Sequence, residues 1–181
     1  LHDALPISKQ IKVAFVGDSG VGKSSLVNYS LDNQEVLDLD GETNLVDIKF
    51  KEIKLNPTSI VNFGMWDFSG KQDSIRIRTE LYQELQGIAY CFDLGNKNSF
   101  NNIENFWMKE VEKYGGNKLK PVCLGLKSDM TKVVDFGTVN NLLHRCSRAV
   151  DRNILCDRSI EHKVFLQYNT YLLAEHGRID K

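Results

Sequence analysis

The sequence predicts an α/β domain of three layers, in which a mostly parallel sheet of about six strands lies between two layers of helices. Two observations support this fold class. Short apolar runs rich in β-branched residues alternate along the chain with runs of helical character, a pattern typical of parallel sheets covered on both faces. A glycine-rich segment, Gly17 to Ser24, also stands between the first strand-like run and the first helix-like run, which is the setting that a phosphate-binding loop needs.

The length and charge of the chain indicate one domain without an electrostatic preference for nucleic acid. A chain of 181 residues suits a single domain, and a formal net charge of −1 gives no basis for binding a polyanion. We expect residues 9–177 to form the domain and residues 178–181 to form a tail. Residues 1–8 (LHDALPIS) do not fit the pattern that begins at Lys9, so we expect them to be non-native or disordered.

The cysteines and the apolar runs bear on the cellular setting. The four cysteines form no CxxC pair, which predicts a reduced, intracellular protein without a zinc site. No apolar run reaches the length of a transmembrane helix. The C-terminal residues HGRIDK contain no cysteine for prenylation, so either the protein has no lipid anchor or the chain is cut short. We expect a cytoplasmic location, with contact to membranes through partners.

In the first half of the chain the patterns predict a strand, a helix and a β-hairpin. Residues 10–16 (QIKVAFV) form a short β-branched run, and residues 23–31 (KSSLVNYSL) follow the glycine-rich turn as a helix. Residues 46–55 (VDIKFKEIKL) alternate with period 2, as a half-exposed strand should, and residues 60–66 (IVNFGMW) are its hairpin partner. The acidic stretch at residues 33–44 lacks periodicity and is expected to be a loop.

In the second half the patterns predict two buried strands with helices between and after them. Residues 88–94 (IAYCFDL) and 121–126 (PVCLGL) have the apolar character of buried strands. Residues 75–85 are expected to be helical, and Ser99 is expected to cap a helix that runs to about Tyr114. Toward the C-terminus we expect two helices and a short strand, at residues 135–149, 162–175 and 153–156 respectively.

The segment from Gly17 to Ser24 matches the pattern G-x-x-x-x-G-K-[ST] at every position. Glycines let the backbone curl around phosphate oxygens with its N–H groups pointing inward, and the following helix presents its positive N-terminal end to the same anion. Lys23 is expected to reach the β- and γ-phosphates, and the Ser24 hydroxyl to ligate Mg²⁺. The nucleotide-binding residues predicted in this segment are Gly17, Asp18, Ser19, Gly20, Val21, Gly22, Lys23, Ser24 and Ser25.

Two further motifs accompany the phosphate loop: T-N-L-V-D-I-K-F from Thr43, and W-D-F-S-G at residues 66–70. With them, residues 9–129 resemble a Ras-superfamily small GTPase of the Rab-like kind. The resemblance implies a P-loop G domain with GTP or GDP as the bound nucleotide and Mg²⁺ as cofactor. It also implies that Thr43 contacts Mg²⁺ and the γ-phosphate, that Asp67 holds Mg²⁺ through water, and that the Gly70 amide senses the γ-phosphate. Lys23, Thr43 and Gly70 are thereby the predicted catalytic residues.

A longer stretch refines the resemblance to one branch of these proteins. Residues 81–107 (LYQELQGIAYCFDLGNKNSFNNIENFW) are similar to Rab-like proteins in general. They look closest to the branch whose GTPase domain is fused to a J domain. That branch generally lacks C-terminal prenylation, which agrees with the absence of a C-terminal cysteine.

The predicted guanine-binding element departs from the family pattern at one position. Residues 125–129 (G-L-K-S-D) resemble the N-K-x-D element, which implies that Asp129 accepts hydrogen bonds from guanine and that Lys127 packs against the base. Leu126 replaces the asparagine, which removes a polar contact to the base and a brace to the phosphate loop. Losing one such bond typically costs about 1–3 kcal/mol, so we expect affinity to fall roughly ten- to a hundredfold.

Two more positions depart from the family pattern. Lys71 stands where most Rab proteins carry the glutamine that orients the attacking water. A protonated lysine cannot accept the water's hydrogen bond, so we expect hydrolysis slower than about 10⁻⁴ s⁻¹, although Lys71 could also be a solvated lysine without a role. The best match to the S-A-K element is Ser159-Ile160-Glu161, a poor one. Ser159 and Ile160 are kept as candidate nucleotide-binding residues.

These observations leave two main functional hypotheses. The first is a GTP/GDP switch in signalling or trafficking that hydrolyses GTP slowly and engages effectors and regulators as a monomer, through loops at residues 33–46 and 69–80. The second is a pseudo-GTPase, an interaction module that keeps a nucleotide as a structural ligand or binds it weakly. A third hypothesis, an ATP-dependent phosphotransferase, is disfavoured because no lid-like arginine cluster is present and Asp129 suits guanine.

Overall fold

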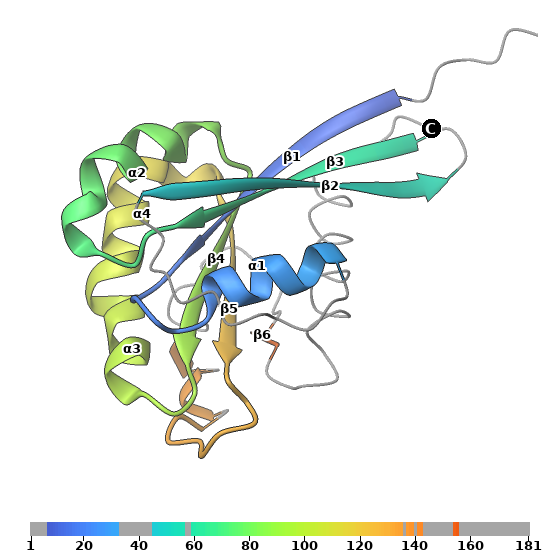
Figure 1. Cartoon of the computed structure of the whole chain (residues 1–181). Coiled ribbons are helices and arrows are strands. Elements are labelled where there is room, and N and C mark those ends of the chain that lie inside the picture. The colour runs from blue at the N-terminus through green and yellow to red at the C-terminus, as the bar shows by residue number, and fades with distance from the viewer. Residues whose placement is uncertain are drawn as a thin grey trace, which may run out of the picture.

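A six-stranded sheet forms the centre of the part of the chain that the structure describes, in the order β2-β3-β1-β4-β5-β6 (Figure 1). The computed structural model describes residues 7–32, 45–56, 59–135, 137–139, 141–142 and 154–155. The strands are β1 (Ile7–Val16), β2 (Val46–Asn56), β3 (Ser59–Phe68), β4 (Gly87–Asp93), β5 (Lys120–Leu126) and β6 (Ile154–Leu155). Only the β2–β3 pair is antiparallel, so the prediction of a mostly parallel sheet of about six strands is confirmed.

Helices cover both faces of this sheet, as the alternation of elements predicts. Helix α1 (Lys23–Asp32) lies on one face, where its Leu26 and Val27 pack with Phe15 of β1 and Phe63 of β3. The helices on the opposite face are α2 (Ile75–Leu81), α3 (Lys97–Asn102) and α4 (Met108–Gly115) (Figure 1). Because successive strand residues point to opposite faces, the same strands supply both hydrophobic clusters.

The helix after β4 is continuous from Lys97 to Gly115 but contains a π-helical segment, η3 (Ile103–Trp107), between α3 and α4. The expectation that Ser99 caps this helix is wrong. The helix begins earlier, and Asn96 is its N-cap: the Asn96 side chain accepts hydrogen bonds from the backbone N–H groups of Asn98 at 3.0 Å and Ser99 at 3.3 Å. Asparagine and serine are both good caps, so residue type alone did not decide between them.

The other helix predicted in the middle of the chain is observed as shorter helical segments. The region expected to be helical at residues 75–85 consists of α2 followed by the 3₁₀ segment η2 (Tyr82–Glu84), and another 3₁₀ segment, η1 (Gln72–Ser74), precedes it. A last 3₁₀ segment, η4 (Gly116–Lys118), leads into β5. No helix in the described part of the chain has the length and apolar character that crossing a bilayer requires.

The observed start of the first strand differs from the predicted one. Strand β1 begins at Ile7, which pairs with Ser59, whereas the pattern predicts a strand that starts at residue 10. The reason is that β3 offers backbone partners at this end, and such pairing does not depend on the side-chain pattern. Residues 137–139 and 141–142 are helical, in line with the expected helix at 135–149. The predicted loop at 33–44 and the predicted helix at 162–175 lie outside the described residues.

Candidate functional site

The segment Gly17 to Ser24 forms a loop between the end of β1 and the first turn of α1, as the motif predicts. Gly17, Gly20 and Gly22 have positive φ angles of 148°, 76° and 109°, which residues with a Cβ rarely adopt. The Gly17 backbone also lies in close contact with β4: a Cβ added to Gly17 would lie 2.0 Å from the Cys91 carbonyl oxygen. A Cβ added at Gly20 would meet nothing within 4 Å, so glycine is favoured there by the curled backbone with its positive φ and not by crowding. This is the backbone shape that a phosphate group requires.

Lys23 lies at the start of α1 with its side chain folded over the loop. The residue is 5% exposed, and its Nζ donates hydrogen bonds to the carbonyl oxygens of Gly17 at 2.9 Å and Asp18 at 2.8 Å. Burial lowers the pKa of Lys23 below its usual value, and the nearby Asp67 and Asp18 carboxylates oppose that shift. A buried ammonium held by two neutral carbonyls is suited to an anionic ligand, because charged acceptors form stronger hydrogen bonds.

Asp67 is 2% exposed and sits near the end of β3, opposite Phe15 of the central strand β1. Its strand neighbour two residues earlier, Met65, belongs to the hydrophobic cluster on the α1 side, so the strand alternation places Asp67 on the same face as the phosphate loop. Ser24 is half-buried in the first turn of α1. Of the predicted metal ligands, Ser24 and Asp67 are therefore on one side of the sheet, while Thr43 lies outside the described residues.

Gly70 brings the loop after β3 into direct contact with the phosphate loop. A Cβ added to Gly70 would lie 2.2 Å from the Ser19 nitrogen and 2.5 Å from the Asp18 carbonyl carbon. Only glycine permits this approach, because the atoms in the way are backbone rather than a movable side chain. The structure thus joins two predicted site segments whose contacting residues, Ser19 and Gly70, are 51 positions apart in the sequence.

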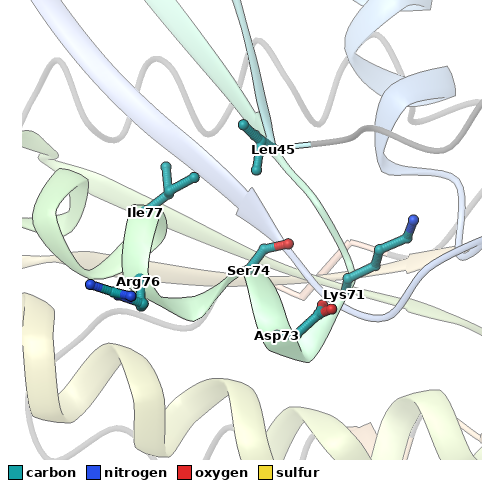
Figure 2. A pocket seen from close by; sticks show the side chains of 6 residues that line it. All are labelled: Leu45, Lys71, Asp73, Ser74, Arg76 and Ile77. Carbon is teal, nitrogen blue, oxygen red and sulfur yellow. The ribbon is translucent and has the colours of Figure 1, made fainter.

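The next residue, Lys71, lies at the surface beside a shallow cavity. Its side chain is exposed, and Figure 2 shows it extending away from Asp73 and Ser74. The cavity has a volume of about 540 Å³ and is open to solvent. Its lining residues are Leu45, Lys71, Asp73, Ser74, Arg76 and Ile77 (Figure 2).

The predicted base-binding residues follow β5. Lys127 has a positive φ of 56°, and its Nζ lies 3.0 Å from an Asp93 carboxylate oxygen. Asp129 is exposed in the turn that follows. Leu126 is 8% exposed, and its Cδ1 lies 3.6 Å from the position that a Cβ on Gly22 would take. An apolar contact to the phosphate loop therefore stands where the family pattern has a polar brace. Ser159 and Ile160 lie outside the described residues.

The sequence reasoning missed a set of residues that support the phosphate loop from the side. One carboxylate oxygen of Asp18 accepts a hydrogen bond from Asn102 Nδ2 at 2.7 Å, and the other accepts one from Trp107 Nε1 at 2.8 Å. In a regular α-helix, residues five apart point to different faces, so periodicity gave no signal for this pair. The π-helical segment η3 follows an i→i+5 pattern and turns Asn102 and Trp107 toward the same carboxylate.

Comparison with known proteins agrees with this geometry. A family model described as the Ras family matches residues 12–159. The chain belongs to the Ras family. Its curated relatives include the Ras-related protein RABE1d of Arabidopsis thaliana, 32% identical over 126 residues that cover 66% of this chain and 54% of the relative. The Ras-related protein Rab-1 of Theileria parva is 32% identical over 124 residues, which cover 67% of this chain and 54% of the relative.

These matches show a Rab-like small GTPase domain of the Ras family, as the motifs predict. Members of the Ras family generally bind GTP or GDP with Mg²⁺, and the family is generally one of GTPases. The chain spans about half the length of the curated relatives it matches.

Proposed function

We propose that this domain binds GTP and GDP with Mg²⁺ and acts as a switch that hydrolyses GTP slowly. The observation that carries the proposal is the contact between two loops: the Gly70 backbone lies against the phosphate loop at Ser19, next to the buried ammonium of Lys23. A γ-phosphate bound by Lys23 would therefore meet both loops, and its loss on hydrolysis would release one from the other.

The residues described at the site fit the phosphates and the metal ion. Lys23 can exchange its two carbonyl partners for phosphate oxygens, since an anion is the stronger acceptor. Ser24 and Asp67, together with Thr43 from outside the described residues, are proposed to hold Mg²⁺. When bound, Mg²⁺ neutralises charge on the phosphate oxygens. The N-terminus of α1 adds a favourable dipole at the same place.

Slow hydrolysis follows from Lys71. This side chain is exposed beside Gly70 and, as an ammonium, has no lone pair with which to orient a water molecule. The catalytic contribution of Lys23, Thr43 and Gly70 would then be to stabilise charge on the phosphates rather than to activate water.

Preference for guanine rests on Asp129 and Lys127. Asp129 is exposed, so its carboxylate can accept hydrogen bonds from the N1 and N2 protons of guanine. The ammonium of Lys127 forms an ion pair with Asp93, and its stem is proposed to pack against the base. Leu126 offers no polar atom, so we expect weaker binding than in relatives with asparagine.

The partners of the domain are proposed to be effector and regulator proteins. Leu45 is 49% exposed and Ile77 is 38% exposed at the rim of the cavity, and β2 adds the exposed side chains of Ile48 and Phe50. Exposed apolar side chains that gather in this way are typical of protein-binding surfaces. Of these residues, Leu45 belongs to the loop at 33–46, Ile77 to the loop at 69–80, and the other two to β2, the strand that follows the first loop. We propose that partners in signalling or trafficking bind here.

A pseudo-GTPase that serves as an interaction module is the second candidate. Two observations favour it: Lys71 lacks the acceptor that hydrolysis uses, and Leu126 is packed into the hydrophobic cluster with Val21 and Leu26. In that case the nucleotide would be a structural ligand, and the apolar surface would be the functional one.

The test of the proposed base site is Asp129→Asn. An amide at this position can pair with the carbonyl of xanthine, so we expect GTP affinity to fall at least about tenfold while xanthosine triphosphate binding is gained. Affinity is measured by titration with fluorescent nucleotides. The control is Asp135→Asn, at an exposed aspartate before the next helical segment, where the oxygen of asparagine can still accept the Thr138 N–H. Unchanged GTP affinity in Asp129→Asn would contradict the base-site assignment.

A further inference from the structure

A buried ion pair lies beneath the loop that carries Gly70. Arg78 of α2 is 1% exposed, and its Nε and Nη2 donate hydrogen bonds to the two carboxylate oxygens of Glu110 of α4, at 2.8 and 2.9 Å. The Tyr82 hydroxyl donates to the same carboxylate at 2.6 Å. A guanidinium can be buried in this way only with such partners, because an unpaired buried charge is strongly destabilising.

The remaining end of the guanidinium holds the backbone on both sides of Gly70. Nη1 of Arg78 donates to the Ser69 carbonyl oxygen at 3.2 Å and to the Lys71 carbonyl oxygen at 2.6 Å. Because both bonds go to backbone atoms, they fix the course of the chain through Gly70 rather than any side chain.

The same guanidinium is linked to the phosphate loop through Trp107. Its Cζ lies 4.9 Å from the centre of the Trp107 ring, in a cation–π contact. The Trp107 Nε1 in turn donates to the Asp18 carboxylate, to which Asn102 also donates. One connected set of side chains therefore supports both loops, whose backbones meet where Gly70 lies against Ser19.

We propose that Arg78 is a positioning residue for γ-phosphate recognition: it holds the Gly70 backbone in place, with Glu110 and Trp107 as its supports. The inference rests on the proposed function, since it concerns the same nucleotide site. A loop that is already ordered loses less conformational freedom on binding its ligand. Only GTP presents a γ-phosphate to Gly70, so the contribution of Arg78 falls on GTP and not on GDP. Trp107, which supports the phosphate loop itself, contributes to both nucleotides.

The test compares the dissociation constants of GDP and of a non-hydrolysable GTP analogue, both with Mg²⁺, in the wild type and three variants. Arg78→Lys keeps the charge beside Glu110 but cannot bridge the carboxylate and both carbonyls, and Arg78→Met removes all the donors. For each we expect the affinity for the GTP analogue to fall about ten- to a hundredfold while the affinity for GDP stays within about threefold, with the larger effect in Arg78→Met. Tyr82→Phe is the matched control: it removes a buried hydrogen bond to Glu110 without touching the loop.

Thermal unfolding of the nucleotide-free variants separates positioning from stability. We expect Arg78→Lys and Tyr82→Phe both to lower the melting temperature, but only Arg78→Lys to change the ratio of the two dissociation constants. If the ratio of the two dissociation constants stays the same in Arg78→Lys as in the wild type, because both affinities fall equally or neither falls, the positioning role is overturned. The proposed function would remain intact. If Arg78→Met does not fold, the result for Arg78→Lys alone tests the positioning role. If the wild type binds neither nucleotide, the proposed function fails and the inference fails with it.

Discussion

Leu126 shows how one residue can exchange a polar contact for an apolar one without disturbing the fold. Its side chain is 8% exposed and packs toward Gly22 and Val21, so the phosphate loop is braced by burial instead of a hydrogen bond. The buried Leu126 side chain stabilises the domain whether or not nucleotide is present, whereas a polar contact to the base stabilises only the nucleotide complex. The residue therefore favours stability of the free domain over nucleotide affinity.

We predict that Leu126→Asn restores the polar contact and removes the apolar one. We expect the nucleotide-free protein to lose about 2–4 kcal/mol of unfolding free energy, because an amide replaces a packed leucine. GDP affinity should rise about tenfold, since the new side chain offers polar contacts to the base and the loop. Denaturant unfolding and nucleotide titration measure the two effects.

The control for this substitution is Leu126→Ala, which removes the apolar contact without adding an amide. It should destabilise the free protein to a similar degree and leave GDP affinity unchanged or lower. Equal affinities for Leu126→Asn and Leu126→Ala would show that the asparagine of the family pattern has no role at this site.

The helix from Lys97 to Gly115 is the element that connects the site to the core. Its first turn is capped by Asn96, its π-helical segment carries Trp107 to the phosphate loop, and its last part carries Glu110 to Arg78. Phe100 and Ile103 anchor the intervening turns in the hydrophobic cluster. The position of this helix therefore determines where both loops of the site are held.

The Asn96 cap stabilises the start of this helix. Asn96→Ala removes the acceptor for the Asn98 and Ser99 N–H groups and should destabilise the domain by about 1 kcal/mol. For a domain of this size that corresponds to a fall in melting temperature of about 2–4 °C. Asn98→Ala is the matched control, because the cap bonds the Asn98 backbone and not its side chain. Equal melting temperatures for the two variants would contradict the cap.

Some of this element could be predicted from the sequence and some could not. The helix itself follows from its position after a buried strand, and its end near Tyr114 agrees with the observed end at Gly115. The cap was misplaced because two good capping residues lie three positions apart. The link from Asn102 and Trp107 to Asp18 could not be predicted, because it depends on a π-helical turn that leaves no mark in the periodicity.

For the whole molecule, the alternation of strand-like and helix-like runs sufficed to predict a mostly parallel sheet of about six strands with helices on both faces, but not the order of its strands. The phosphate loop could be placed because its pattern requires a strand before it and a helix after it. The network around Arg78 could not, because its partners come from loops and helices that only the tertiary structure brings together. Glu110 is 32 residues from Arg78 in the sequence, and nothing in either segment marks the pair.

We propose above that the domain binds guanine nucleotides and hydrolyses GTP slowly. The most direct test of this proposal is the nucleotide content of the purified protein, measured by denaturation followed by anion-exchange chromatography. We predict bound GTP at close to one equivalent, because Lys23 and the phosphate loop retain it and Lys71 does not orient water. Bound GDP alone would contradict slow hydrolysis. An empty protein that also fails to bind added GTP with Mg²⁺ would contradict the switch and leave the interaction module.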